Sequence, residues 1–181
     1  MAKTIQITII GAGDCGEEAR KRAFEVGERL GRAGATLLCG GRGGVMDAAA
    51  AGAEAVGGLV VGVLPGSSPA DTRPGTHLGV ELYTGIGQAR NQVLVLSGDA
   101  VIGVSGGWGT LTEIAIALKH EVPVVLLDSW KLERPDGEVE PLLQRANDPA
   151  EAVGIALAAA RERTTATGGT RIRLTRRTTD E

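Results

Sequence analysis

Aromatic residues are scarce in this chain, which has two Trp, one Tyr and one Phe among 181 residues. A hydrophobic core must therefore be built from Ala, Val, Leu and Ile. The stacking surfaces with which proteins bind single-stranded nucleic acid are also lacking. The formal net charge of −3 gives no basic excess of the kind that nucleic-acid-binding surfaces show. We therefore expect no nucleic-acid partner.

Cysteine and histidine are equally rare. Cys15, Cys39, His77 and His120 have no metal-ligand spacing, and two thiols do not make a disulfide framework. We expect no metal site and a reducing compartment. The apolar run near the N-terminus is too short for a signal peptide, and no run reaches the length of a membrane span. The sequence thus predicts a cytoplasmic protein without a membrane partner.

Short β-branched runs alternate with longer stretches rich in Ala, Leu, Glu and Arg. The predicted strands are residues 5–10, 36–39, 59–64, 80–83, 100–104 and 122–127, and the predicted helices are 15–32, 45–56, 88–97, 111–120 and 149–163. Strands that are apolar throughout and alternate with helices indicate a mostly parallel sheet with helices on both faces. We therefore predict an α/β fold: one Rossmann-like domain over residues 1–163. The Thr- and Arg-rich residues 164–181 are predicted to be a disordered tail, with an added edge strand at 171–174 as the alternative.

Glycine is abundant, with 28 residues, and it clusters where the predicted strands end. Clusters at residues 11–13, 40–44, 65–66 and 106–109 all fall on the carboxyl edge of the predicted sheet. Ligands of open α/β sheets bind at this edge. We therefore expect the ligand site there.

The first cluster, Gly11-Ala12-Gly13-Asp14-Cys15-Gly16, matches the G-x-G-x-x-G pattern of dinucleotide-binding proteins. Such a site also needs a carboxylate after the second strand, where this chain has Cys39-Gly40-Gly41. The match therefore does not favour NAD binding. Gly11 and Gly13 are expected to line a pocket, and Asp14 with Glu17 is interpreted as a helix cap and its capping-box partner.

The second cluster, Gly40-Gly41-Arg42-Gly43-Gly44-Val45-Met46, opens a predicted helix. Its free amides and the helix dipole favour an anion, and an Arg in the middle of the loop favours a ligand role. The alternative is that the glycines only permit a sharp turn. We expect Gly40, Gly41, Arg42, Gly43 and Met46 to line the pocket.

The third cluster, Ser105-Gly106-Gly107-Trp108-Gly109-Thr110, is the strongest motif. The backbone amides of Gly106, Gly107 and Gly109 are placed to converge on phosphate oxygens, and the Thr110 hydroxyl adds a further donor. No Gly-Lys-Ser/Thr follows, so this is not the loop of a nucleoside-triphosphatase. The motif predicts a site for a phosphate monoester.

Glu113 and Arg90 each have two interpretations. Thr110-Leu111-Thr112-Glu113 matches a capping box, and alternatively Glu113 faces the ligand one turn beyond the phosphate. An Arg in the first turn of a helix opposes the dipole. Arg90 therefore either pairs with Glu113 or the ligand, or is a solvated surface residue.

Three motifs in this order, Gly40 to Met46, Ala89-Arg90-Asn91 and Ser105 to Glu113, resemble the LOG-like Rossmann superfamily over roughly residues 4 to 160. That superfamily contains cytokinin-activating phosphoribohydrolases and molybdenum cofactor carrier proteins. The resemblance implies a homo-oligomer (dimer or tetramer), for which the Ala-rich residues 47–56 offer a packing surface. In the phosphoribohydrolases the catalytic residues correspond to Arg90 and Glu113.

The chain departs from that pattern at two places. The superfamily motif P-G-G-x-G-T-x-x-E has Ser105 here in place of Pro, and the Lys that usually follows the catalytic Arg is Asn91. The run from Gly87 to Asn91 looks closer to the carrier branch.

The resemblance implies two functions. One is a carrier or binding protein for a phosphate monoester of a heterocycle, either molybdenum cofactor or an AMP-like nucleotide, with no required cofactor. The other is a phosphoribohydrolase that releases a base from a nucleoside 5′-monophosphate. Lysine decarboxylase, a label that many members carry, is excluded because none of the four lysines lies in a loop able to hold pyridoxal phosphate. DNA binding, known for related domains, is disfavoured by the acidic balance.

Overall fold

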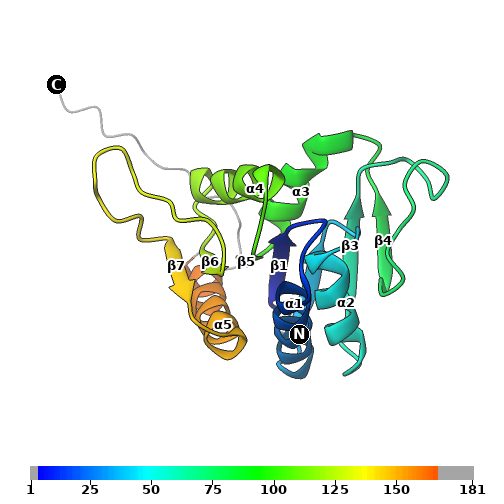
Figure 1. Cartoon of the computed structure of the whole chain (residues 1–181), viewed down its shortest axis with the longest axis horizontal. Helices are drawn as coiled ribbons and strands as arrows, with labels where there is room; N and C mark the ends of the chain where they lie inside the picture. Colours follow the sequence, from blue (N-terminus) through cyan, green and yellow to red (C-terminus); the bar gives the residue numbers. More distant parts are fainter. Residues whose placement is uncertain (1–3, 167–181) are drawn as a thin grey trace.

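The computed structural model describes residues 4–166. They form one seven-stranded sheet with helices on both sides (Figure 1). The strands are β1 (Gln6–Gly11), β2 (Thr36–Cys39), β3 (Val60–Leu64), β4 (Val80–Tyr83), β5 (Ala100–Val104), β6 (Val124–Leu127) and β7 (Leu143–Ala146). The helices are α1 (Glu17–Arg32), α2 (Val45–Glu54), α3 (Arg90–Ser97), α4 (Trp108–Lys119) and α5 (Pro149–Ala166), with a 3-10 turn, η1 (Gly87–Ala89), before α3.

All neighbouring strands are parallel, in the order β4-β3-β2-β1-β5-β6-β7. The chain therefore builds outward from β1 to β4, returns to the other side of β1, and builds outward again. The order reverses between β1 and β5, so the loops after these two strands leave toward opposite faces of the sheet. This is the topological switch point at which open α/β sheets bind ligands. The predicted fold class is confirmed.

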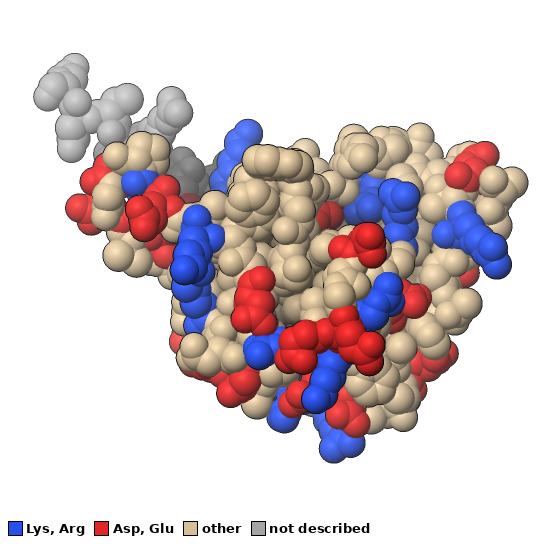
Figure 2. Space-filling model, viewed as in Figure 1, with Lys and Arg blue, Asp and Glu red and all other residues tan. Residues whose placement is uncertain are grey.

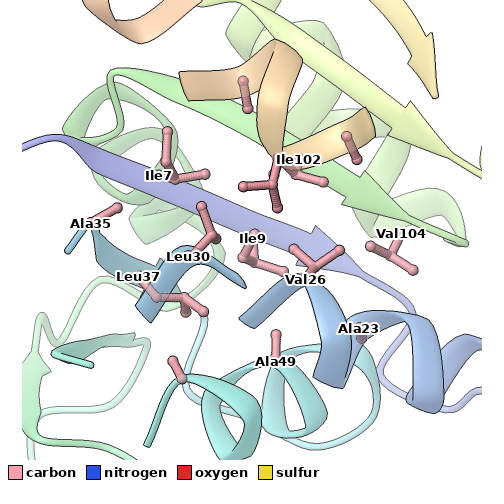
Figure 3. Close-up of a cluster of buried hydrophobic side chains, with 14 of the residues drawn as sticks. Ile7, Ile9, Ala23, Val26, Leu30, Ala35, Leu37, Ala49, Ile102 and Val104 are labelled. Atoms are coloured by element: carbon pink, nitrogen blue, oxygen red, sulfur yellow. The ribbon is translucent and has the colours of Figure 1, made fainter. Parts of the chain in front are cut away.

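The main core lies between the sheet and the layer of α1, α2 and α5. Figure 3 shows Ile7 and Ile9 of β1 and Ile102 of β5 meeting Val26 and Leu30 of α1. A second cluster lies on the other face, where Ile114 of α4 and Val95 of α3 pack against the sheet. The core residues are almost all aliphatic, as the shortage of aromatic residues requires.

Small residues let α1 and α2 approach closely. A Cβ built on Gly27 would lie 1.9 Å from the carbonyl oxygen of Ala49, and one on Gly52 would lie 2.0 Å from the carbonyl oxygen of Phe24. The buried alanines of α2, Ala49 and Ala53 among them, belong to the core inside the chain. The Ala-rich residues expected to contact another subunit thus have an intramolecular partner.

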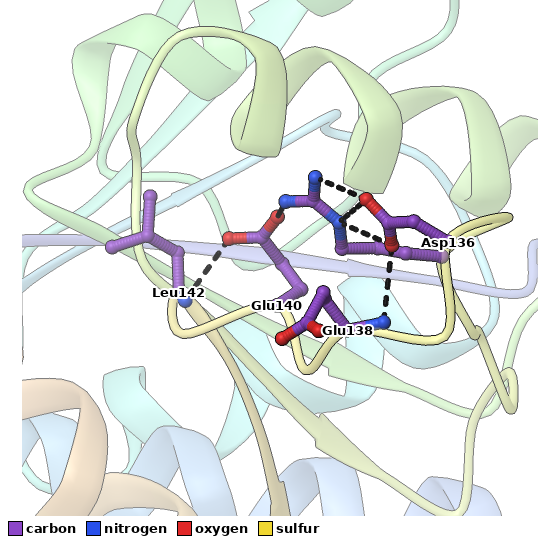
Figure 4. Close-up of polar contacts among 5 residues, drawn as sticks. Asp136, Glu138, Glu140 and Leu142 are labelled. Atoms are coloured by element: carbon purple, nitrogen blue, oxygen red, sulfur yellow. Dashed lines mark hydrogen bonds and ion pairs between the residues drawn. The ribbon is translucent and has the colours of Figure 1, made fainter.

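The sequence did not reveal β7. Its residues alternate little in polarity, and two of its four side chains are exposed, because it forms the edge of the sheet. The long connection from β6 to β7 is held by polar contacts (Figure 4). Arg134 binds Asp136 at 2.9 Å, the Glu138 amide donates to Asp136, and the Leu142 amide donates to Glu140.

Several predicted ends were misplaced. The predicted helix 88–97 is divided into η1 and α3, α4 begins three residues before the predicted start, and α5 continues to Ala166. The remainder of the predicted tail lies outside the described residues. Strands β2, β4 and β5 have the predicted bounds.

Charged side chains of both signs intermingle over α1, whereas the surface over α4 is mostly uncharged (Figure 2). Salt bridges within α1 are of the i,i+4 type, such as Arg29 with Glu25 at 2.7 Å, and Arg22 also pairs with Asp128 at 3.0 Å. No helix among residues 4–166 has the length and apolar character needed to cross a membrane.

The Gly27 contact makes a testable prediction. Gly27→Ala should destabilise the protein by roughly 1–3 kcal/mol, because the new methyl group forces α1 away from the Ala49 backbone and this outweighs the better helix propensity of Ala. Gly154→Ala on α5 is the matched control. A Cβ at Gly154 has no atom within 4 Å, so this variant should gain up to about 1 kcal/mol. Urea unfolding measures both, and equal effects would contradict the packing argument.

Candidate functional site

The loops that follow β1, β2 and β5 meet at the carboxyl edge of the sheet and carry the predicted site residues. The loop after β1 contacts the loop after β2 directly, because the Val45 amide donates to the Ala12 carbonyl at 3.0 Å. The loop after β5 leads into α4. The candidate site is therefore centred on the switch point between β1 and β5.

Helix α4 presents an N-terminus whose dipole is not neutralised by its own side chains. It begins at Trp108 with Gly107 as N-cap, and its first turn has no acidic residue. In contrast, the first turn of α1 has Glu17 and Glu18, and that of α2 has Asp47. The amides of the first turn have no partner within a helix. Among these three helix starts, that of α4 is the best suited to an anion.

The glycines of this loop fall into two kinds. Gly106 has φ +140°, and a Cβ there would lie 2.7 Å from the Thr110 side chain, so the fold itself requires glycine. Gly107 and Gly109 differ, because a Cβ at either position would meet no atom within 4 Å. Gly109 even lies inside α4, where glycine costs up to about 1 kcal/mol relative to alanine. Neither packing nor conformation explains these two glycines.

The loop after β6 braces the loop after β5. The Ser129 hydroxyl donates to the Ser105 carbonyl, and the Trp130 indole N–H donates to the Gly107 carbonyl at 3.2 Å. Trp130 also contacts Trp108, with ring centroids 5.3 Å apart, while Trp108 remains 78% exposed. Both tryptophans of the chain thus adjoin the glycine loop. The sequence analysis did not identify Trp130 as part of the site. The only signal for it was that tryptophan is rare in this chain.

Arg90 and Glu113 form a buried ion pair. Arg90 begins α3 and Glu113 lies in the second turn of α4; each residue is 7% exposed. Arg90 Nη1 lies 3.6 Å from Glu113 Oε1. The predicted pairing is confirmed, and the alternative of a solvated surface Arg is wrong.

Glu113 is not a capping residue. Because α4 begins at Trp108, Thr110 lies inside the helix and cannot be its N-cap. The capping-box interpretation of Asp14 and Glu17 is also wrong, since the N-cap of α1 is Gly16 and no side chain caps it. At both helix starts the N-cap residue is a glycine, whereas the sequence pattern predicted a polar side chain as the N-cap.

Burial dominates the protonation of the pair. It raises the pKa of Glu113 to about 7, even though the nearby Arg90 favours the carboxylate. Burial likewise lowers the pKa of Arg90, and the positive charge of Arg42 lowers it further. A carboxyl group with a pKa near 7 can accept and return a proton at neutral pH.

Arg90 is tightly enclosed but incompletely bonded. A Cβ on Gly40 would lie 2.9 Å from Arg90 Nη2 and 3.0 Å from Met46 Sδ, so the space beside the guanidinium depends on Gly40. Within residues 4–166, Arg90 Nε and Nη1 have no hydrogen-bond partner, and neither has Asn91 Oδ1. Buried polar atoms of this kind usually mark the place of a ligand or an ordered water.

The other predicted pocket glycines are of two kinds: some are packed against neighbouring atoms, and others have open space where a side chain would be. A Cβ on Gly11 would lie 2.5 Å from the Val104 carbonyl oxygen, and one on Gly41 would lie 2.6 Å from the Leu64 side chain. Those two glycines permit close packing of the strand ends. Positions 13 and 43 are open, with nothing nearer than 3.7 Å to the Cβ of Gly43.

Neither thiol nor metal chemistry is supported by the described residues at the carboxyl edge of the sheet. Burial raises the pKa of the Cys39 thiol to about 11, so this thiol stays protonated and is a weak nucleophile. Within the described part of the chain, no group of three or more His, Cys, Asp or Glu side chains is placed to hold a metal ion.

Fold and candidate site together define a Rossmann-like protein in which the glycine loop after β5 leads into a helix start without acidic residues. Residues 4–162 match the model of the SLOG cluster4 family, and the chain belongs to that family. It is 42% identical to an uncharacterized protein of Archaeoglobus fulgidus over 144 residues, which are 76% of this chain and 93% of that one. It is 32% identical to a cytokinin riboside 5′-monophosphate phosphoribohydrolase of Mycobacterium tuberculosis over 62% of this chain and 64% of that protein.

Similar solved structures support the same family assignment. The molybdenum cofactor binding protein of Rippkaea orientalis superposes with a TM-score of 0.77 at 30% identity, covering 87% of this chain and 98% of that one. The molybdenum cofactor carrier protein of Chlamydomonas reinhardtii does so with a TM-score of 0.77 at 33% identity, covering 88% and 99%. The resemblance to the LOG-like superfamily is thereby confirmed.

The backbone conformation at Ser105 explains why this chain lacks the Pro of the superfamily motif. Its φ is +55°, and its amide donates to the Leu127 carbonyl at 3.0 Å. Proline has φ near −65° and no N–H group, so it cannot occupy this position without rearranging the loop. The β5–α4 loop therefore has a conformation that the P-G-G-x-G-T motif does not permit.

The raised pKa of Glu113 predicts how stability depends on pH. Since its folded pKa of about 7 lies above its ordinary value of 4.5, the folded state binds more protons between these values. The contribution of Glu113 to stability is therefore complete below pH 4.5 and is lost as the pH rises through 7. Glu113→Gln should remove this decline, measured as the free energy of unfolding from pH 4.5 to 8. An unchanged profile would contradict the raised pKa.

Proposed function

We propose that this protein binds a phosphate monoester of a heterocycle and acts as its carrier, with molybdenum cofactor as the cargo we favour. The phosphate lies at the start of α4, where backbone amides of the Gly106–Gly109 loop and the Thr110 hydroxyl bind it. The heterocycle extends toward Arg90 and the Gly40–Gly44 loop. The protein acts as a homo-oligomer, a dimer or tetramer, and the carrier role requires no bond to be broken.

The observation that carries this proposal is the pair of glycines at 107 and 109. The protein itself leaves room for a side chain at both positions. At the carboxyl edge of the sheet, where ligands of open α/β folds bind, close approach of a ligand to the backbone is a reason for glycine that the fold itself does not supply. A phosphate on the helix start supplies that ligand, because it needs direct access to the first amides of α4.

The molybdenum cofactor is supported by similarity and by chemistry. Two neighbours that superpose over nearly their whole length are a binding protein and a carrier protein for this cofactor. The cofactor combines a phosphate with a flat pterin, so it fits a site with a phosphate-binding helix start and a buried guanidinium beyond it. The unpartnered Nε and Nη1 atoms of Arg90 supply donors for the pterin side.

Gly109→Ala separates binding from stability. The added methyl group meets no protein atom, so the variant should be as stable as the wild type or more stable by up to about 1 kcal/mol. Its affinity for a phosphate monoester should fall at least tenfold, because the methyl group occupies the space of the phosphate. Calorimetric titration with AMP and with a pterin phosphate measures this loss. Gly154→Ala is the control, and unchanged affinity in Gly109→Ala would refute the proposed phosphate site.

A second function, phosphoribohydrolase, is favoured by the buried Arg90–Glu113 pair. Glu113 lies three residues after Thr110, on the same face of α4 and one turn from the proposed phosphate. A carboxyl group there can stabilise the oxocarbenium-like state at the anomeric carbon as the base departs, and can direct a water to that carbon. Arg90 then orients the carboxyl group and the sugar.

Incubation with AMP tests this second function. If the protein is a hydrolase, chromatography detects adenine and ribose 5-phosphate, and Glu113→Gln abolishes their release while AMP still shifts the melting temperature. If the protein is a carrier, AMP raises the melting temperature and no adenine appears with either form. Release that persists in Glu113→Gln would exclude Glu113 as the catalytic residue.

A further inference from the structure

A cleft of about 320 Å³ lies to one side of the Arg90–Glu113 pair. It is formed by the loop after β2, the start of α2 and the segment before β4. The lining residues are Arg42, Gly43, Asp47, Arg73, Pro74, Gly75 and Thr76. The phosphate loop of α4 contributes none of them.

The two arginines of the cleft are notable in the sequence. Arg42 and Arg73 are the only Lys or Arg residues between Arg32 and Arg90, and both line this cleft. Within residues 4–166 neither guanidinium has a hydrogen bond or an ion pair. Figure 2 shows basic side chains on this side of the molecule, over the loops that follow β2 and β3.

The walls of the cleft are held together by contacts. The Gly75 amide donates to the Gly41 carbonyl at 3.0 Å, and His77 lies 2.6 Å from Glu54 of α2. Asp47, the one carboxylate of the lining, lies against the Gly75 backbone. Two guanidinium groups and the start of α2 thus outweigh one carboxylate, which leaves the cleft positive.

The cleft adjoins the proposed ligand site. Gly43 faces the carbonyl of Gly13 in the loop after β1, and the charge of Arg42 acts on the buried Arg90. Like charges at Arg42 and Arg90 repel each other, and an anion bound near Arg42 would offset this repulsion. Two buried nitrogens of Arg90 also have no hydrogen-bond partner among residues 4–166.

We propose that this cleft is a second anion subsite, in which Arg42 and Arg73 bind an oxyanion at the end of the ligand remote from the phosphate on α4. This inference rests on the proposed function and specifies its ligand class: a heterocycle with anionic groups at two ends. Two planar guanidinium groups suit the paired oxygens of a phosphate or of another tetrahedral oxyanion.

Titration calorimetry at low salt tests the second subsite with three probes. AMP has one phosphate group, ADP adds a second on the same chain, and adenosine 3′,5′-bisphosphate adds it on the ribose. We expect at least one of the two probes with two phosphate groups to bind about tenfold more tightly than AMP, the order of one charge-assisted hydrogen bond. Arg73→Gln should remove this preference and leave the affinity for AMP within twofold. Arg42→Gln should also remove the preference, but Arg42 belongs to the proposed pocket, so for this variant only the ratio of the affinities for the probes is compared.

Arg32→Gln is the matched control, because it removes the same charge from the C-terminal turn of α1, at the opposite edge of the sheet. It should keep the preference. If AMP binds but neither probe with two phosphate groups binds more tightly, the second subsite is refuted and the proposed function stands. If the preference survives in both cleft variants, the subsite is likewise refuted. If none of the three probes binds, the proposed function and the subsite fail together.

Discussion

The parallel pairing of β1 with β5 is the contact on which both the fold and the site depend. Five residues of each strand are in register, from Ile7 opposite Ala100 to Gly11 opposite Val104. Because the chain builds outward from this pair in both directions, the loops that follow the two strands diverge and leave space between them. Gly11 permits the pairing to continue to the end of the strands, since a Cβ there would lie 2.5 Å from the Val104 carbonyl oxygen. The start of α4 is thereby placed beside the loops that carry the other glycines.

The Arg90–Glu113 pair does not have the geometry of a stabilising interaction. Its 3.6 Å separation exceeds that of the surface pairs on α1, such as Arg32 with Glu28 at 2.7 Å, and exceeds the roughly 2.7–2.9 Å of a charge-assisted hydrogen bond. Removing two ions from water costs several kcal/mol for each, and two guanidinium nitrogens gain no hydrogen bond among residues 4–166 in return. The pair lowers stability where it lies. The ligand proposed at the switch point would offset this cost by bonding to the unpartnered guanidinium nitrogens.

The sequence predicted the central sheet well because its signal is local. Apolar runs bounded by glycine mark β2 and β5 to the residue, whereas β7 is an exposed edge strand with no such run. Capping was predicted poorly at α1 and α4, because Thr-x-x-Glu and Asp-x-x-Glu spacings occur by chance and glycine performs the role instead. The partnership of Arg90 with Glu113 was one option among several from spacing alone. The convergence of Arg42 with Arg73 had no signal at all, because it depends on how the segment before β4 folds back over the loop after β2.

The protonation of Glu113 connects the two functions that this scaffold can support. A phosphate bound one turn away adds negative charge near a carboxyl group whose pKa is already about 7, and a neighbouring negative charge raises the pKa of an acid further. The bound state therefore favours the neutral carboxylic acid, which donates a hydrogen bond but cannot stabilise a developing oxocarbenium charge. Where the superfamily motif usually has a Lys after the catalytic Arg, this chain has Asn91, buried and neutral, which supports the proposed carrier function over the proposed hydrolase.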